Sequence, residues 1–188
     1  MSKPENLSEL AAVIKDFAKR YPNDGYDKGF KNLVKSDSLE DYGSWANGSA
    51  MRVSFIGFNL DTLEECLEQS KLTAMTTHNS EEDIKRSQTI TVAIFLAKNN
   101  LTKEVIKNKI VELFNYDLDR KIVDIRANYK FDVSCEGSVP ESIIFFLDST
   151  DYESAIYNAI SLGSNSDTQA CMAGGIAKAY YKKFLKNL

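Results

Sequence analysis

Apolar residues recur at spacings of three and four along most of the chain, and this pattern predicts a series of amphipathic helices. The first run, whose members are expected to point inward from one face, consists of Leu7, Leu10, Ala11, Ile14, Phe17, Ala18 and Tyr21. Asn6 followed by Glu9 is typical of a capping box at a helix start. The chain is therefore expected to open with a helix that ends at the turn-forming residues 22–25.

Later helices are indicated by capping residues that stand before apolar runs. The predicted starts are Asp61, Ser80, Thr102, Ser138, Asp151 and a position near Asp167. The helix after Thr102 is expected to turn Ile106, Ile110, Leu113 and Phe114 inward. Pro140, two residues after Ser138, suits a first helical turn. Lys130 to Ser134 is the nearest approach to strand-like alternation, and it is short.

Small residues at helical spacing mark the last predicted helix, at Ala170, Ala173, Gly174 and Ala177. Such a stripe allows close packing against a neighbouring helix. The fold class predicted from these patterns is all-α. With 188 residues, of which 43% are hydrophobic, the chain is expected to form one compact domain over residues 1–188.

Charge and hydropathy exclude several classes of function. The chain has 23 basic and 27 acidic residues, a net charge of −4, so no nucleic acid partner is expected. No apolar run is long enough to span a membrane, and the first residues do not resemble a signal peptide. We therefore expect a cytoplasmic protein.

The three cysteines are widely spaced and the chain has one histidine. An odd, dispersed set of cysteines argues against a disulfide framework, and a tetrahedral zinc site would have to be assembled from distant residues. Any bound metal is expected to have oxygen ligands.

Three polar stretches lie at predicted helix junctions, where binding residues are often placed: Trp45 to Arg52, Thr76 to Asn79, and Gly163 to Thr168. Asn47 and Gly48 are either a connecting turn or part of an anion cradle. In the second interpretation, the backbone N–H groups of Gly48, Ser49 and Ala50 face a pyrophosphate at a helix start.

The other two stretches also allow two interpretations. His78 is either a hydrogen-bond donor to a ligand or a solvated loop residue. Asp167 and Thr168 are either a helix cap with its first turn or two hard oxygen ligands suited to Mg²⁺.

Four motifs occurring in order bear on these alternatives. They are Ala46-Asn47-Gly48-Ser49-Ala50-Met51-Arg52-Val53-Ser54, Thr77-His78-Asn79, Ser134-Cys135-Glu136-Gly137-Ser138-Val139-Pro140-Glu141 and Asn165-Ser166-Asp167-Thr168-Gln169-Ala170-Cys171-Met172-Ala173-Gly174-Gly175. From about Phe17 to Tyr181 the chain resembles the ADP-ribosylglycohydrolase family.

The resemblance implies an orthogonal all-helical domain and Mg²⁺-dependent hydrolysis of the glycosidic bond between ADP-ribose and a protein side chain or small acceptor. It implies ADP-ribose contacts from Asn47, Gly48, Ser49 and His78, with stacking on Trp45. Asp167 and Thr168 resemble metal ligands, and Asn165 is a third candidate oxygen donor.

The chain departs from the family pattern in several places. It lacks the Gly-Asp and Thr-Asp-Asp-Thr motifs that supply most of the metal ligands, so we expect it to begin within the fold, without the family's first helices. Asn165 stands where the family has an aspartate, and it brings no charge to a metal. Ala46 and Phe55 replace a glycine and a proline.

These departures leave two hypotheses. The chain is either a hydrolase completed by a second copy or a complementing chain, or a non-catalytic homologue that binds ADP-ribose, an ADP-ribosylated protein or a toxin. Absence of the first helices is expected to expose apolar surface, which favours a partner.

Overall fold

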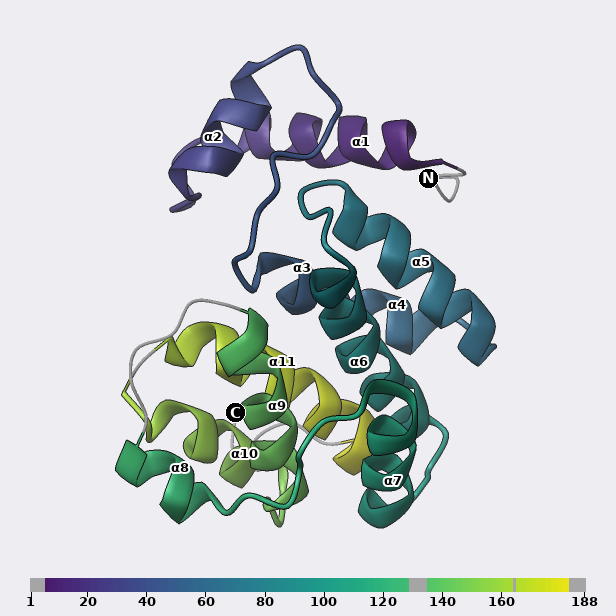
Figure 1. Ribbon diagram of the computed structural model, residues 1–188, viewed down its shortest axis with the longest axis vertical. Helices are drawn as coiled ribbons and strands as arrows, with labels where there is room; N and C mark the ends of the chain where they lie inside the picture. The colour runs from purple at the N-terminus through teal and green to yellow at the C-terminus, as the bar shows by residue number, and fades with distance from the viewer. Residues whose placement is uncertain (1–5, 129–134, 164, 183–188) are drawn as a thin grey trace.

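The computed structural model describes residues 6–128, 135–163 and 165–182, and within these ranges helices joined by loops make up the fold, without a β-strand. The helices, shown in Figure 1, are α1 (Leu7–Arg20), α2 (Lys28–Lys35), α3 (Gly48–Met51), α4 (Ser54–Asn59), α5 (Leu63–Met75), α6 (Glu81–Lys98), α7 (Lys103–Phe114), α8 (Ile122–Asn128), α9 (Cys135–Leu147), α10 (Tyr152–Ile160) and α11 (Ser166–Tyr181). The all-α prediction is confirmed.

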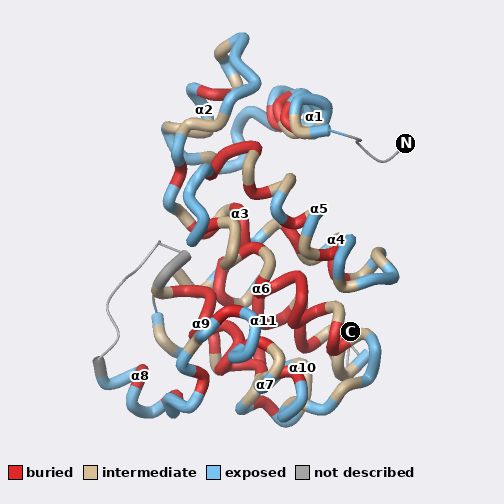
Figure 2. Tube along the Cα trace, turned by 45° about the vertical axis from the view of Figure 1, so that its right-hand side comes forward, coloured by how far each residue is buried: buried red, intermediate tan, exposed pale blue. Residues whose placement is uncertain are grey.

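Helix α6 forms the centre of the core. It packs against α3, α4, α5, α7, α9 and α11, and the buried part of the chain in Figure 2 gathers around it. Two of its buried threonines lose no hydrogen bonding, because Thr89 and Thr91 donate their hydroxyls to the carbonyls of Lys85 and Ser87, at 2.8 and 3.0 Å. Both threonines can therefore be buried without leaving their hydroxyls unpaired.

Two glycines allow helices to approach closely. A Cβ at Gly57 in α4 would lie 2.7 Å from the backbone oxygen of Thr91 in α6. A Cβ at Gly174 in α11 would lie 2.8 Å from Cδ1 of Ile156 in α10. The predicted close packing of the small-residue stripe is thus confirmed, with α10 as the neighbour at Gly174.

Most predicted helix starts are confirmed by their caps. The side chains of Asn6, Ser80, Thr102 and Asp151 each accept the backbone N–H three residues later. The prediction for α5 was wrong by one residue, because Thr62 and not Asp61 accepts from the N–H of Glu65. The strand-like segment at Lys130 to Ser134 lies outside the described residues.

The predicted start at Ser138 was wrong. Helix α9 begins at Cys135, so Pro140 lies inside it, and Ser138 is a buried residue of the second turn. Its carbonyl accepts from the hydroxyl of Ser142 at 2.7 Å, a bond between residues four apart within the helix. Tertiary packing of α9 on α11 and α6 outweighs the local signal of a serine followed by proline.

Two predicted inward faces were wrong in part. In α7, Ile106, Ile110 and Phe114 are buried, but Leu113 is 39% exposed. Phe17 in α1 and Tyr21 directly after it are 52% and 47% exposed, because the contacts of α1 with α2 and α5 leave its aromatic side open. No described helix is long and apolar enough to cross a membrane.

Candidate functional site

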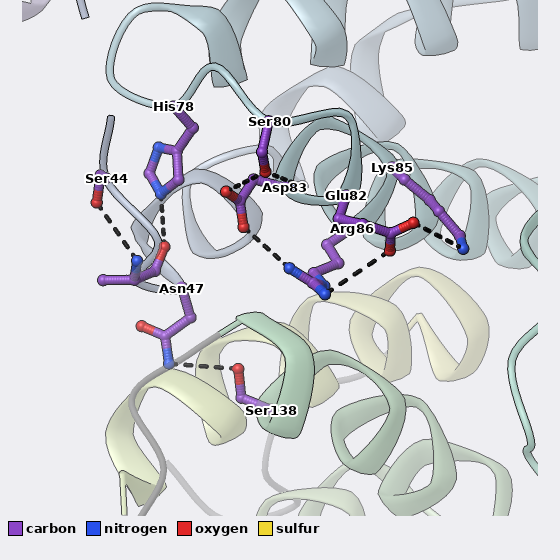
Figure 3. A network of polar contacts seen from close by, with 10 residues as sticks. Ser44, Asn47, His78, Ser80, Glu82, Asp83, Lys85, Arg86 and Ser138 are labelled. Atoms are coloured by element: carbon purple, nitrogen blue, oxygen red, sulfur yellow. Dashed lines mark hydrogen bonds and ion pairs between the residues drawn. The ribbon is translucent and has the colours of Figure 1, made fainter. Parts of the chain in front are cut away.

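The first two polar stretches meet beside α3. The backbone N–H of Ser44 donates to the carbonyl of Thr77 at 2.9 Å, so the segment before α3 runs along the joint between α5 and α6. Figure 3 shows Ser44 and His78 beside the segment before α3, with the side chain of Asn47 directed away from them toward Ser138. Helix α3 also packs against α11, which brings the third stretch to the same part of the molecule.

Asn47 is anchored from the opposite side. Its side chain is buried, and its amide Nδ2 donates to the hydroxyl of Ser138 in α9 at 3.3 Å (Figure 3). The residue that opens α3 is therefore tied to a helix 91 residues away in the chain. This amide hydrogen bond is internal to the protein, so Asn47 orients the start of α3.

His78 is 1% exposed, which excludes the solvated-loop interpretation. Its Nε2 lies 2.6 Å from the carbonyl oxygen of Ala46, and its Nδ1 lies 2.7 Å from the hydroxyl of Thr77. A carbonyl oxygen only accepts, so Nε2 carries the proton and Nδ1 accepts from Thr77. Both ring nitrogens thus have partners within the chain.

Arg52 lies next to Thr77, on the Nδ1 side of the His78 ring. Its Nη2 lies 2.7 Å from the carbonyl oxygen of Thr73, 3.1 Å from the hydroxyl of Thr76 and 2.7 Å from the hydroxyl of Thr77. Because a guanidinium only donates, all three threonine oxygens accept from it. The side chain that follows α3 in sequence therefore holds the C-terminal end of α5.

Burial lowers the pKa of His78, and the nearby Arg52 cation acts in the same direction, while the hydrogen bond to Ala46 and the charges of Asp83 and Asp41 oppose the shift. In the unfolded chain the histidine side chain has a pKa of about 6.5, so it binds a proton more readily there than in the folded protein. The protein is then destabilised by acid through this group.

We expect the free energy of unfolding to fall between pH 7.5 and 5.5, with a slope of at most about 1.4 kcal/mol per pH unit from this one proton. His78 is the chain's single histidine, so a His78→Gln variant should show a flatter profile over the same window. Urea unfolding at three pH values measures both. Equal slopes for the two proteins would contradict the assignment.

The proposed anion cradle lies in the first turn of α3. Gly48, Ser49 and Ala50 supply its opening amides, and the side chains of Ser49 and Ala50 are fully buried. Trp45, three residues earlier, is 63% exposed, so its indole is accessible for stacking. Contact of these residues with a ligand remains a prediction.

The candidate metal ligands lie at the start of α11. Asn165 precedes the helix and makes no capping hydrogen bond with its side chain. The hydroxyl of Thr168 donates to its Oδ1 at 3.3 Å, and Asp167 lies exposed in the same turn. The predicted helix start near Asp167 is confirmed, since α11 begins at Ser166, but the cap position belongs to Asn165, so Asp167 does not cap the helix.

These residues do not make a complete magnesium site. Mg²⁺ is bound by oxygen ligands in octahedral geometry and usually by one or two carboxylates in addition to water or substrate oxygens. Here, two neutral oxygens face each other and one carboxylate is near. The described part of the chain contains no group of three or more His, Cys, Asp or Glu side chains placed to hold a metal ion.

A cleft of about 730 Å³ borders the joint on the side away from Asn47. Its lining residues come from α1, the 39–43 loop, α5, the α5–α6 joint and α6: Leu7, Ser8, Leu39, Glu40, Asp41, Tyr42, Gly43, Met75, His78, Asn79 and Ile84. Glu40 and Asp41 are its two carboxylates. Burial raises the pKa of Tyr42, whose hydroxyl donates to Asp27 at 3.3 Å.

Three residues of this site received no role from the sequence: Arg52, Thr77 and Ser138. Arg52 carried one weak signal, a single arginine between Met51 and Val53 in an otherwise uncharged segment. Ser138 carried a misleading signal, since it resembles a helix cap. The roles of Arg52 and Ser138 depend on partners between 21 and 91 residues away in sequence.

Comparison with known proteins bears on the whole chain. The family model described as ADP-ribosylglycohydrolase matches residues 6–183. A solved structure described as "ADP-ribosylglycohydrolase-related protein complex" is similar, with a TM-score of 0.65 and 17% sequence identity over 94% of this chain and 64% of that chain. The chain thus spans less than two thirds of that structure's chain. No curated protein matches significantly in sequence.

Proposed function

We propose, from the premise that this chain belongs to the ADP-ribosylglycohydrolase family, that it binds the ADP-ribose part of an ADP-ribosylated protein or small acceptor. One observation carries the proposal: the segment before α3 is held between the α5–α6 joint and α9, and α3 itself packs against α11. The residues implied in ADP-ribose binding by the family resemblance, Trp45 to Ser49 and His78, therefore lie in one region, although about 30 residues separate them in sequence.

Backbone groups and Trp45 are the proposed contacts to the ligand. The amides of Gly48, Ser49 and Ala50 would face the pyrophosphate, and the exposed indole would stack on a ring of the ligand. Asn47 and His78 use their polar atoms within the chain, so their contribution to binding is to hold the loop that presents these amides.

Calorimetric titration of ADP-ribose into the purified chain, with and without Mg²⁺, tests this proposal. We expect a Kd in the micromolar range, about −8 kcal/mol of binding free energy, with little dependence on Mg²⁺ because the described residues supply one nearby carboxylate. Absence of heat in both titrations would refute the binding proposal. Strong enhancement by Mg²⁺ would show that the start of α11 organises a metal.

Asn47→Ala is expected to weaken ADP-ribose binding about tenfold, since the loss of one hydrogen bond of about 1.4 kcal/mol releases the start of α3 from α9. Asn99→Ala is the matched control, because Asn99 is an exposed asparagine at the far end of α6. The same titration measures both variants. Equal affinities would remove Asn47 from the site.

Hydrolysis of the ADP-ribosyl bond is the second candidate function. It is favoured by the three oxygen-bearing side chains in one turn of α11, those of Asn165, Asp167 and Thr168. Since these do not complete a metal site, turnover would need carboxylates from a second copy, a complementing chain or another segment. Release of ADP-ribose from a modified protein, lost in Asp167→Ala, would support this function.

A further inference from the structure

We propose that Arg52, Thr77 and His78 form one positioning unit that fixes the backbone at residues 44–48, and that His78 acts on the ligand site through the carbonyl of Ala46. The expected effect of this unit on ADP-ribose affinity rests on the function proposed above. The unit itself consists of contacts within the chain and can be tested without any ligand.

The direction of every hydrogen bond in the unit follows from its two ends. A guanidinium only donates and a carbonyl only accepts, so the order runs from Arg52 to the Thr77 hydroxyl, from that hydroxyl to Nδ1 of His78, and from Nε2 to Ala46. The three distances are 2.7, 2.7 and 2.6 Å. One tautomer of the neutral ring fits this order, with the proton on Nε2.

The unit holds the segment at two points. The side chain of His78 binds the Ala46 carbonyl, and the backbone carbonyl of Thr77 accepts the N–H of Ser44 at 2.9 Å. Thr77 and His78 are each 1% exposed, so water does not compete for these bonds. Ser44 and Ala46, two residues apart in the segment before α3, are therefore both fixed to the α5–α6 joint.

Burial favours the neutral form of the ring, and the Arg52 cation, which contacts Thr77 on the Nδ1 side, acts in the same direction. The carboxylates of Asp83 and Asp41 oppose this shift of the pKa. Asp83 is compensated by Ser80 and Arg86, at 2.5 and 3.0 Å (Figure 3). A protonated ring would have to give up the hydrogen bond from Thr77, because Nδ1 could then only donate.

Nuclear magnetic resonance of the histidine ring tests the tautomer directly, since the chain has a single histidine. At pH 7.5, we expect a protonated Nε2 and an unprotonated Nδ1 in the wild type and in Thr77→Ser, which keeps the hydroxyl. Thr77→Val, of nearly the same shape, should keep the proton on Nε2, because the Ala46 carbonyl still accepts it, but should shift the Nδ1 resonance, since Nδ1 loses its hydrogen-bond donor. A protonated Nδ1 in the wild type would overturn the proposal.

Two substitutions of His78 separate its two hydrogen bonds. Glutamine places an amide nitrogen near the position of Nε2 and can still donate to Ala46, whereas asparagine is too short to reach it. We expect His78→Gln to keep wild-type hydrogen-exchange protection of the Ser44 amide and most of the affinity for ADP-ribose. His78→Asn should lose about tenfold in both protection and affinity. Asn108→Ala, at an exposed asparagine on α7, is the control.

The outcomes distinguish the two proposals. If the wild type binds no ADP-ribose, the proposed function fails. The tautomer of the His78 ring and the hydrogen exchange of the Ser44 amide would still test whether the positioning unit exists. Equal loss of protection in both His78 variants would refute the unit, provided that circular dichroism shows both to be folded. Thr77→Val serves as the independent variant if His78→Asn does not fold.

Discussion

Replacing Phe145 with alanine is expected to lower the free energy of unfolding by about 3–5 kcal/mol. Phe145 is fully buried in α9, within the core cluster that joins this helix to α6 and α11. Truncation removes a ring and leaves a cavity that the close-packed helices cannot fill. Since domains of this kind are stable by about 5–15 kcal/mol, a large part of the total would be lost.

Urea unfolding measures this effect, and Phe55→Ala is the matched control. Phe55 has the same side chain but is 73% exposed, so its removal is expected to change the free energy by about 0.5 kcal/mol or less. A loss below about 1 kcal/mol for Phe145→Ala would mean that the core collapses around the missing ring. In that case α9 would be less firmly packed than its burial indicates.

Arg52→Met is expected to have the next largest effect, a loss of about 3 kcal/mol in stability together with loss of ADP-ribose binding. Methionine is unbranched and apolar, but it cannot donate to the oxygens of Thr73, Thr76 and Thr77. Those acceptors would lose a charged donor in a part-buried environment. The end of α5 and the segment before α3 would be released together.

Thermal unfolding and the ADP-ribose titration measure the two effects. Arg20→Met is the control, because Arg20 is exposed and its ion pair with Asp16 is a surface contact worth about 1 kcal/mol at most. Unchanged ADP-ribose binding by Arg52→Met would show that the segment before α3 stays in place without the hydrogen bonds that Arg52 donates to the end of α5. Equal stability losses in both arginine variants would contradict the central role of Arg52.

Local signals predicted the helices well because a cap acts within four residues. The predicted caps Asn6, Ser80, Thr102 and Asp151 all accept the expected backbone N–H. The start of α9 could not be predicted in this way. There, burial against two other helices extends the helix before Ser138, and no local property of the sequence encodes that packing.

The candidate site was predicted in its parts and not in its arrangement. Sequence motifs indicated Asn47, His78 and Asp167, and the structure places their segments around α3. The side-chain partners Ser138 and Thr77 were missed, and these determine that Asn47 and His78 face inward. Whether a polar side chain meets a ligand or another part of the chain depends on which groups the fold brings within hydrogen-bond distance.

Amphipathic spacing and capping residues were sufficient to determine an all-α chain and the approximate bounds of its helices, because both act over a few residues. The neutral tautomer of His78, the role of Arg52 and the exposure of the aromatic face of α1 follow from contacts between distant helices. Such contacts depend on how the helices pack, since burial and hydrogen-bond partners are properties of the assembled core.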